Sequence, residues 1–251
     1  SSDVCPEIRE YERFTTTVIN AYIKPLMSNY LKKLDYELKE KGFNCPLLLM
    51  TSGGTLTNVS SACNNPVRLV ESGPAGGSIL ATSIAKDLNL NKVISFDMGG
   101  TTAKITIIED KKAIKAREFE VDRKARFKKG SGFPLRIPVI EMVEIGAGGG
   151  SIARVNKLEQ IITGPDSAGS FPGPACYSNG GTLPTITDAD LVIGKINPEN
   201  FASGKIKLSK DLAINAITKN VGQIVNLDTD TAALAISEIV DETMSNAARV
   251  H

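Results

Sequence analysis

Residues 95–108, SFDMGGTTAKITII, decide how this chain folds. Apolar and β-branched residues precede the turn at 93–96, and a second alternating segment follows it at 105–108. A glycine-containing turn, residues 99–102, separates the two segments. This pattern predicts a tight β-hairpin.

The turn of this hairpin is a candidate phosphate site. Gly99 and Gly100 lack side chains, so successive backbone N–H groups can converge on an anion. The hydroxyls of Thr101 and Thr102 add donors, and Asp97 at the mouth of the turn can bind Mg²⁺ or its water. The alternative is an ordinary hairpin whose glycines only supply positive φ.

A second glycine-rich stretch, residues 138–153 (PVIEMVEIGAGGGSIA), combines a strand with a loop. Gly146, Gly148, Gly149 and Gly150 make this loop dense enough in glycine to wrap an anion with main-chain N–H groups. The loop is not a Walker A motif, because no Lys-Ser/Thr pair follows. A strand-like IARV follows it, which is not typical of a dinucleotide fingerprint.

Residues 67–77, VRLVESGPAGG, lead from a strand-like segment into a helix. The helix is expected over GSILATSIAK at 77–86, and small residues, Ser72 and Gly73 among them, lead into it. A helix start of this kind can contact a nucleotide or act as a pivot between lobes. The alternative is close packing of the helix on a sheet. Upstream, residues 46–50 predict a short buried strand that stops at another glycine turn, residues 51–54.

Helices are expected at both ends of the chain. Apolar residues at three- and four-residue spacing predict a helix over residues 7–41, interrupted near Pro25 and ended by Gly42. Near the C-terminus, Ser209 is a good N-cap for one core helix, and Asp228 or Thr229 starts another.

The composition narrows the classes of partner. The chain has 251 residues, 41% of them hydrophobic, so it can bury a full core. A net charge of +1 gives no global field that favours nucleic acid or an anionic membrane. The opening SSDVCPEIRE has no basic region before an apolar run, and no stretch has the length of a membrane span. We therefore expect a soluble protein.

Cysteine and histidine usage excludes several kinds of site. The four cysteines, at positions 5, 45, 63 and 176, show no close pairing, and the single histidine is the last residue, His251. Local zinc-finger sites and histidine-based catalytic triads within the chain are therefore excluded. Reduced thiols fit a cytoplasmic protein.

Two further segments have competing interpretations. Residues 164–185 form a loop that is long enough to be functional. For Cys176 within it, a buried neutral thiol is favoured over a nucleophile. Asp188 and Asp190 can cap a helix or bind a metal, and capping is the simpler explanation. Residues 111–130 are rich in both charges, which favours a solvated strand pair and loop over a nucleic-acid patch.

Six ordered motifs resemble the hydantoinase A / 5-oxoprolinase family. They are ESGPAGG at 71–77, FDMGGTTAK at 96–104, EIGAGGGS at 144–151, GPDSAG at 164–169, PGPACY at 172–177 and TDAD at 187–190. The resemblance covers nearly the whole chain. The TAK ending of the second motif is most similar to the N-methylhydantoinase-like branch.

The resemblance implies an α/β, actin-like ATPase fold, in which ribonuclease H-like lobes hold mixed sheets flanked by helices. Residues 1–70 would be the C-terminal part of the first lobe, 71–91 a linking helix and 92–251 most of the second lobe. ATP and Mg²⁺ would be cofactors, and ATP hydrolysis would drive the opening of a cyclic amide such as hydantoin, N-methylhydantoin or 5-oxoproline. A companion hydantoinase B-type subunit or domain would be the partner.

For individual residues, the resemblance implies a second phosphate-binding hairpin. Asp97 would be the catalytic residue and would hold Mg²⁺ largely through water or phosphate, while Gly99, Gly100 and Thr101 would donate to phosphates. Many members have an aspartate in place of Lys104, which here either pairs with a phosphate or faces solvent.

Full-length members also contain an earlier Asp-x-Gly-Gly-Thr hairpin and a later glycine-rich nucleotide loop. We therefore expect this chain to be a central piece that binds nucleotide weakly by itself. Two alternatives share the fold. One is the nucleotide-activating subunit of an acetone or acetophenone carboxylase-like enzyme, and the other is a non-catalytic scaffold that binds a second subunit through residues 164–185.

Overall fold

The computed structural model describes residues 1–122 and 130–250. The chain divides into two compact units, Ser1–Ser95 with Thr106–Met142, and Phe96–Ile105 with Val143–His251. The expected domain limits at 70 and 91 stay a prediction. The expected solvated loop within 111–130 lies partly at 123–129, outside the described residues.

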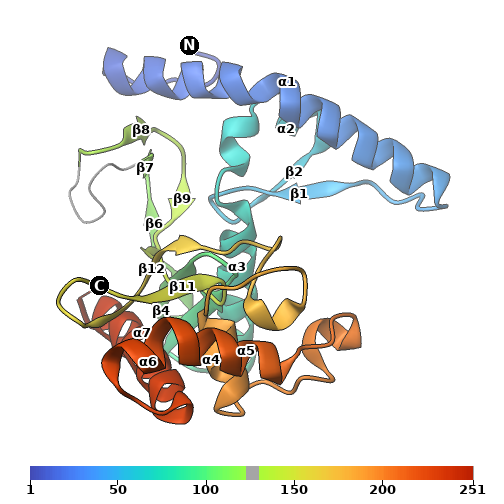
Figure 1. Ribbon diagram of the computed structural model, residues 1–251. Helices are drawn as coiled ribbons and strands as arrows, with labels where there is room; N and C mark the ends of the chain where they lie inside the picture. Colours follow the sequence, from blue (N-terminus) through green and yellow to red (C-terminus); the bar gives the residue numbers. More distant parts are fainter. Residues whose placement is uncertain (123–129, 251) are drawn as a thin grey trace. The chain divides into compact units, whose positions relative to one another are not determined.

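The first unit is built on one long helix, α1 (Glu10–Glu40), which Figure 1 shows as a continuous ribbon. The predicted interruption near Pro25 is wrong. Proline removes one N–H from the helix, but the turns on either side keep their own hydrogen bonds. Pro25 is also exposed, so its ring displaces no core side chain and the helix continues through it. Gly42 follows the helix end with a φ of +88°, as a C-terminal glycine should.

The buried side of α1 is partly polar. The helix contacts α2 (Val59–Asn64), the 3₁₀ turn η1 (Pro66–Leu69) and β8 (Phe133–Leu135). Thr16 Oγ1 accepts from the N–H of Arg136 (2.9 Å). Asn20 donates to Asn64 O and accepts from the Val67 N–H, both at 3.1 Å. These bonds satisfy backbone groups that the interface buries.

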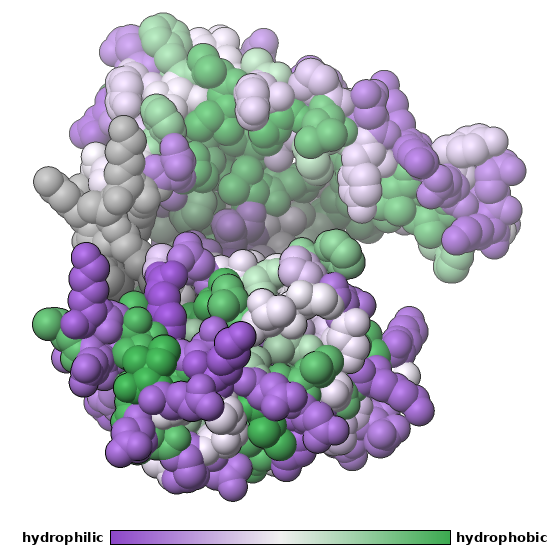
Figure 2. Space-filling model, viewed as in Figure 1, coloured by the Kyte–Doolittle hydropathy of each residue, from purple (hydrophilic) through white to green (hydrophobic). Residues whose placement is uncertain are grey.

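The opposite side of α1 is apolar and exposed. The exposed residues are Tyr11, Phe14, Val18, Tyr22, Leu26 and Tyr30. Figure 2 shows hydrophobic surface along this helix. The apolar spacing therefore predicted the helix correctly but not which side of it is buried.

A small hairpin and a second helix complete this part of the unit. β1 (Leu48–Met50) pairs antiparallel with β2 (Leu56–Asn58), and β1 is more exposed than predicted. Residues 67–70, predicted as strand-like, lie mostly in η1, because a short apolar run does not distinguish a strand from a helical turn. α3 (Ser72–Asp87) contains the predicted helical segment at 77–86 and begins earlier, at Ser72.

The predicted hairpin is present as β3 (Lys92–Met98) and β4 (Ala103–Glu109), strands that contribute residues to both units. The Gly99 N–H donates to Thr102 O (2.9 Å) and the Asp110 N–H donates to Asn91 O (2.8 Å). Both bonds fit one antiparallel register, which places Asp97 opposite Lys104.

Short antiparallel strands accompany this hairpin. β10 (Val143–Ile145) pairs with β4 on the side away from β3, giving the order β10-β4-β3, and β5 (Lys112–Ala113) pairs with the end of β4. β6 (Lys115–Ala116) pairs with β9 (Val139–Ile140), and β7 (Phe119–Val121) pairs with β8.

The rest of the second unit is one hairpin followed by helices. β11 (Ser151–Val155) pairs with β12 (Ile161–Ser167), so the IARV segment is a strand, as predicted. The helical elements are η2 (Ala175–Tyr177), α4 (Ile186–Val192), η3 (Phe201–Gly204), α5 (Lys210–Ile217), the π-turn η4 (Thr218–Gly222), α6 (Gln223–Val225) and α7 (Thr229–Val250). Ser209 caps α5 as predicted.

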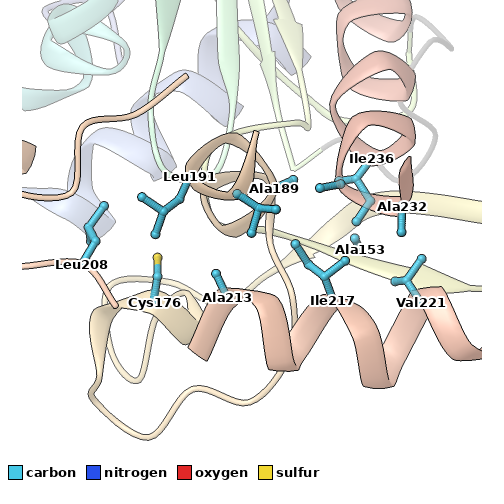
Figure 3. Close-up of a cluster of buried hydrophobic side chains, with 12 residues drawn as sticks. Ala153, Cys176, Ala189, Leu191, Leu208, Ala213, Ile217, Val221, Ala232 and Ile236 are labelled. Carbon is cyan, nitrogen blue, oxygen red and sulfur yellow. The ribbon is translucent and has the colours of Figure 1, made fainter. Parts of the chain in front are cut away.

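Two apolar clusters hold the second unit together. In one, Ala103, Ile105 and Ile145 of the sheet pack with Val240 and Met244 of α7. In the other, side chains from α4, α5 and α7 surround Cys176 and Ala153, as Figure 3 shows. Because α7 contributes to both clusters, it links the sheet to the helical part of the unit.

No helix among the described residues is long and apolar enough to cross a membrane.

Candidate functional site

The turn at residues 99–102 lies at the surface of the second unit. Gly99 uses its N–H to close the turn, but within the part of the chain that the structure describes, the N–H groups of Gly100 and Thr101 bond to no protein acceptor. Gly99, Gly100, Thr101 and Asp97 are all exposed. Two adjacent backbone donors are therefore available to an anion, as a phosphate site requires.

The second glycine-rich loop packs directly against the back of this turn. The Gly149 N–H donates to Gly99 O (3.0 Å) and the Gly150 N–H donates to Gly100 O (2.7 Å). A Cβ on Gly148 would lie 2.6 Å from Gly99 O, and also 2.6 Å from the Thr101 nitrogen. Glycine is required here because two backbones approach more closely than any side chain permits.

The glycine spacing predicted that the N–H groups of this loop surround an anion. The observed packing differs, because most of these groups already have acceptors within the protein. Besides the bonds of Gly149 and Gly150, the Gly148 N–H donates to Ser151 Oγ (2.9 Å). Gly146 contributes a carbonyl oxygen that a Cβ on Gly164 would approach to 2.9 Å. Two of the four candidate glycines, Gly149 and Gly150, therefore use their N–H groups to support the turn, and Gly148 uses its N–H within the loop itself.

Two further motifs bond to this glycine loop and to the turn. Thr187 donates both its N–H and its hydroxyl to Gly149 O, each at 2.8 Å. The Ala168 N–H donates to Gly150 O (2.8 Å), and Ser167 Oγ donates to Gly100 O (3.4 Å). Motifs that are separated by up to about ninety residues in the sequence thus converge on one turn.

Asp188 anchors the long loop at residues 164–185. Its buried carboxylate accepts from the N–H groups of Ala175 (3.2 Å), Cys176 (2.7 Å) and Thr185 (2.8 Å), and from Thr185 Oγ1 (2.8 Å). With Thr185 it forms a capping box at the start of α4, which confirms the predicted capping role for Asp188. Asp190 does not cap, because it lies within α4, where its carboxylate accepts from Ser237 Oγ.

The thiol of Cys176 is buried beside this carboxylate. Burial, reinforced by the charge of Asp188, raises the pKa of the Cys176 thiol well above its ordinary value. The thiol is therefore neutral near pH 7, which supports the buried-thiol interpretation over a nucleophile.

Lys104 lies beside the turn. Its Nζ donates to Thr102 Oγ1 (3.1 Å) and to Glu144 Oε1 (3.4 Å). Glu144 of β10 is the direct cross-strand neighbour of Lys104 in the sheet. A cation therefore lies within hydrogen-bond distance of one of the hydroxyls expected to bind phosphate.

A family model described as hydantoinase/oxoprolinase matches residues 13–250. The chain belongs to this family. It is 45% identical to an uncharacterised protein of Methanocaldococcus jannaschii, over 100% of this chain and 37% of that protein. It is 34% identical to the caprolactamase subunit alpha of Pseudomonas jessenii, over 98% of this chain and 34% of the subunit.

Solved structures of hydantoinase/oxoprolinase relatives have the same fold. The nucleotide-free structure of acetone carboxylase, from work on ATP-dependent acetone carboxylation, matches with a TM-score of 0.81 at 27% identity, covering 96% of this chain and 32% of that chain. The predicted α/β, actin-like fold is therefore confirmed. The chain spans about a third of the length of the curated relatives it matches.

The polar groups of this turn are of the kinds that the phosphates of ATP and their Mg²⁺ require. It offers two available backbone N–H groups, two threonine hydroxyls and one exposed carboxylate, Asp97. Mg²⁺ bound to a nucleotide commonly needs only one or two protein carboxylates, because phosphates and waters complete its shell. Among the described residues, no group of three or more acidic, histidine or cysteine side chains could hold a metal alone.

Ser72 and Gly73 belong to the other unit, in the first turn of α3. A Cβ on Gly73 would meet no atom within 4 Å, so helix packing within that unit does not explain this glycine. Their contact with a nucleotide stays a prediction.

Sequence reasoning missed the residues that support the turn from behind. Ser167 and Thr187 bond its backbone or that of the glycine loop, and Glu144 pairs with Lys104. Each of these residues lies inside one of the sequence motifs. Only the strand register and the path of the loops show which of their polar groups form hydrogen bonds.

Proposed function

We propose that this hydantoinase/oxoprolinase chain is part of an ATP-dependent enzyme that opens a cyclic amide, of the hydantoin, N-methylhydantoin or 5-oxoproline type. In this proposal the turn at residues 99–102 is one phosphate site of the nucleotide. The observation that carries it is the pair of available N–H groups at Gly100 and Thr101, on a turn that hydrogen bonds from the glycine loop hold in place. The similarity to the Pseudomonas jessenii caprolactamase subunit supports the substrate class, because a lactam is a cyclic amide.

The proposed roles follow from the donors on the turn. The N–H groups of Gly100 and Thr101, with the hydroxyls of Thr101 and Thr102, bind phosphate oxygens. Asp97 holds Mg²⁺ largely through water or phosphate. When bound, Mg-ATP supplies a phosphoryl group whose transfer requires positioning and charge stabilisation rather than histidine chemistry.

The glycines at 146, 148, 149 and 150 have a supporting role in this proposal. Their close backbone packing holds the turn in one geometry before the nucleotide arrives. Donors that need no reorganisation stabilise developing charge most effectively. Ser72 and Gly73 are proposed as further nucleotide contacts, and a hydantoinase B-type subunit or domain as the partner.

Replacement of Asp97 by Ala in the whole protein tests the assignment. We expect the rate of ATP hydrolysis to fall by about a hundredfold or more, since a contact to transition-state charge is lost. Asp110→Asn is the matched control, because Asp110 is an exposed aspartate at the other end of the same hairpin. Turnover of Asp97→Ala at the wild-type rate would refute the assignment.

A second candidate is the nucleotide-activating subunit of a ketone carboxylase. The TM-score of 0.81 to acetone carboxylase favours it. Both enzymes would use the same phosphate turn, so the test is the substrate that stimulates ATP hydrolysis. Stimulation by hydantoin or 5-oxoproline supports the amide-opening enzyme, whereas stimulation by acetone or acetophenone supports the carboxylase.

A further inference from the structure

Three charged side chains form a row across the sheet beside the turn. The hairpin register places Asp97 opposite Lys104, and Lys104 is paired in turn with Glu144. Cross-strand neighbours have Cβ atoms about 5 Å apart, so the row places one cation between two carboxylates. Of these three residues, the proposed function assigns a role to Asp97 alone.

The ammonium of Lys104 bonds both to the turn and to Glu144. The 15% exposed side chain of Lys104 is largely enclosed, and its Nζ lies 3.1 Å from Thr102 Oγ1. Since the ammonium only donates, Thr102 uses an oxygen lone pair for this bond and keeps its own O–H for another acceptor. A phosphate bound by Thr102 would therefore lie near the ammonium of Lys104.

The bond between Lys104 and Glu144 is loose enough to be exchanged. Its length of 3.4 Å exceeds the 2.7–2.9 Å typical of a strong charge-assisted hydrogen bond, and the Glu144 side chain is 49% exposed. An ion pair with one partner open to solvent and a long N–O distance contributes little to stability. A phosphate, with its higher charge, can compete with Glu144 for the ammonium.

We propose that Lys104 binds phosphate at this turn, and that Glu144 is a positioning residue which competes with the phosphate for Lys104. This inference rests on the proposed function of the turn. Glu144 holds the ammonium beside the turn while the nucleotide is absent and weakens nucleotide affinity by its charge. Loss of the Glu144 charge therefore tightens binding, which loss of a purely structural contact would not do.

The test is the Kd of Mg-ATP, measured by calorimetry on the whole protein and on variants. Glu144→Gln is expected to lower the Kd by about two- to fivefold, the range that one exposed ion pair provides. Lys104→Met is expected to raise it by about tenfold or more, because a charged contact is lost. In the double variant, Glu144→Gln should have little further effect. Glu141→Gln, three residues earlier and also exposed, is the control and should leave the Kd unchanged.

The outcomes separate the two proposals. If the wild-type protein binds no Mg-ATP, the proposed function of the turn is overturned and this inference with it. If the wild-type protein binds Mg-ATP but Glu144→Gln leaves the Kd unchanged or raises it, only this inference is overturned. It is also overturned if Glu144→Gln tightens binding equally in the Lys104→Met variant and in the wild-type protein, since Glu144 would then act without Lys104.

Discussion

At the residue scale, Gly148 shows why a glycine can be essential without touching a ligand. Its φ is not in the positive region, so its backbone conformation is open to other residues. The restriction comes from the turn packed against it, where the nearest atoms belong to the backbone of residues 99–101. Backbone atoms cannot move aside as a flexible side chain can, so a methyl group must displace the turn.

Gly148→Ala should therefore destabilise the protein by about 1–3 kcal/mol, the usual cost of overpacking, and weaken Mg-ATP binding. Gly77→Ala is the matched control, because Gly77 lies within α3 and its Cβ would meet open space. Removing a helical glycine should raise stability by roughly 0.5–1 kcal/mol. Urea unfolding measures both effects, and a Gly148→Ala protein as stable as wild type would contradict the packing argument.

The cysteines should differ sharply in reactivity. Cys45 is exposed, whereas Cys5, Cys63 and Cys176 are buried. Burial also raises the pKa of the Cys176 thiol, so little thiolate forms at pH 8. In a titration of the native chain with a thiol reagent, we expect one fast reaction that Cys45→Ser removes. Fast labelling of Cys176, identified by mass spectrometry, would contradict its buried position.

At the scale of single elements, helix α4 and its neighbour α7 share a charged contact with a defined pH response. Ser237 Oγ donates to Asp190 (3.0 Å), and Lys195 bonds Ser237 (2.7 Å) and Asp241 (3.2 Å). Burial raises the pKa of Asp190, and the charge of the nearby Asp241 raises it further. The hydrogen bond from Ser237 and the charge of Lys195 lower this pKa, but by less than burial raises it. The folded state thus favours the protonated form of Asp190.

A raised carboxyl pKa contributes stability at low pH, and the contribution is lost as the pH rises through the folded pKa. The Asp190→Asn variant keeps an oxygen that can accept from Ser237 but cannot ionise. We therefore expect its free energy of unfolding, relative to wild type, to increase as the pH rises from about 3 to 7. Urea unfolding at several pH values gives this difference, and a decrease with rising pH would contradict the assignment.

Elements whose signals are local were predictable from the sequence. The β3–β4 hairpin follows from alternating β-branched residues around a glycine turn, and the cap of α5 follows from Ser209. The N-cap of α4, Thr185, was not predicted, because the TDAD motif was expected to precede a helix and lies within it. The errors arose where one short pattern permits two structures. η1 replaced a predicted strand, and α1 continued through Pro25 because an exposed proline can be accommodated.

At the scale of the whole molecule, the sequence predicted the family and fold but not how the motifs meet. Six motifs gave the correct family because their order is specific. The packing of Gly148 and Ser167 on the turn, and of Thr187 on the glycine loop, depends on long-range contacts that no local pattern encodes. For the same reason the glycine loop was predicted to wrap an anion, although the N–H groups of Gly149 and Gly150 bond to the turn and that of Gly148 bonds to Ser151.

The central claim is that the turn at residues 99–102 receives the phosphates of a nucleotide. Hydrogen–deuterium exchange on the whole protein, with and without Mg²⁺ and a non-hydrolysable ATP analogue, tests it most directly. We predict slower exchange of the Gly100 and Thr101 amides when the nucleotide is bound, because both N–H groups gain an acceptor. Unchanged exchange of these two amides at a nucleotide concentration that saturates the protein would contradict the claim.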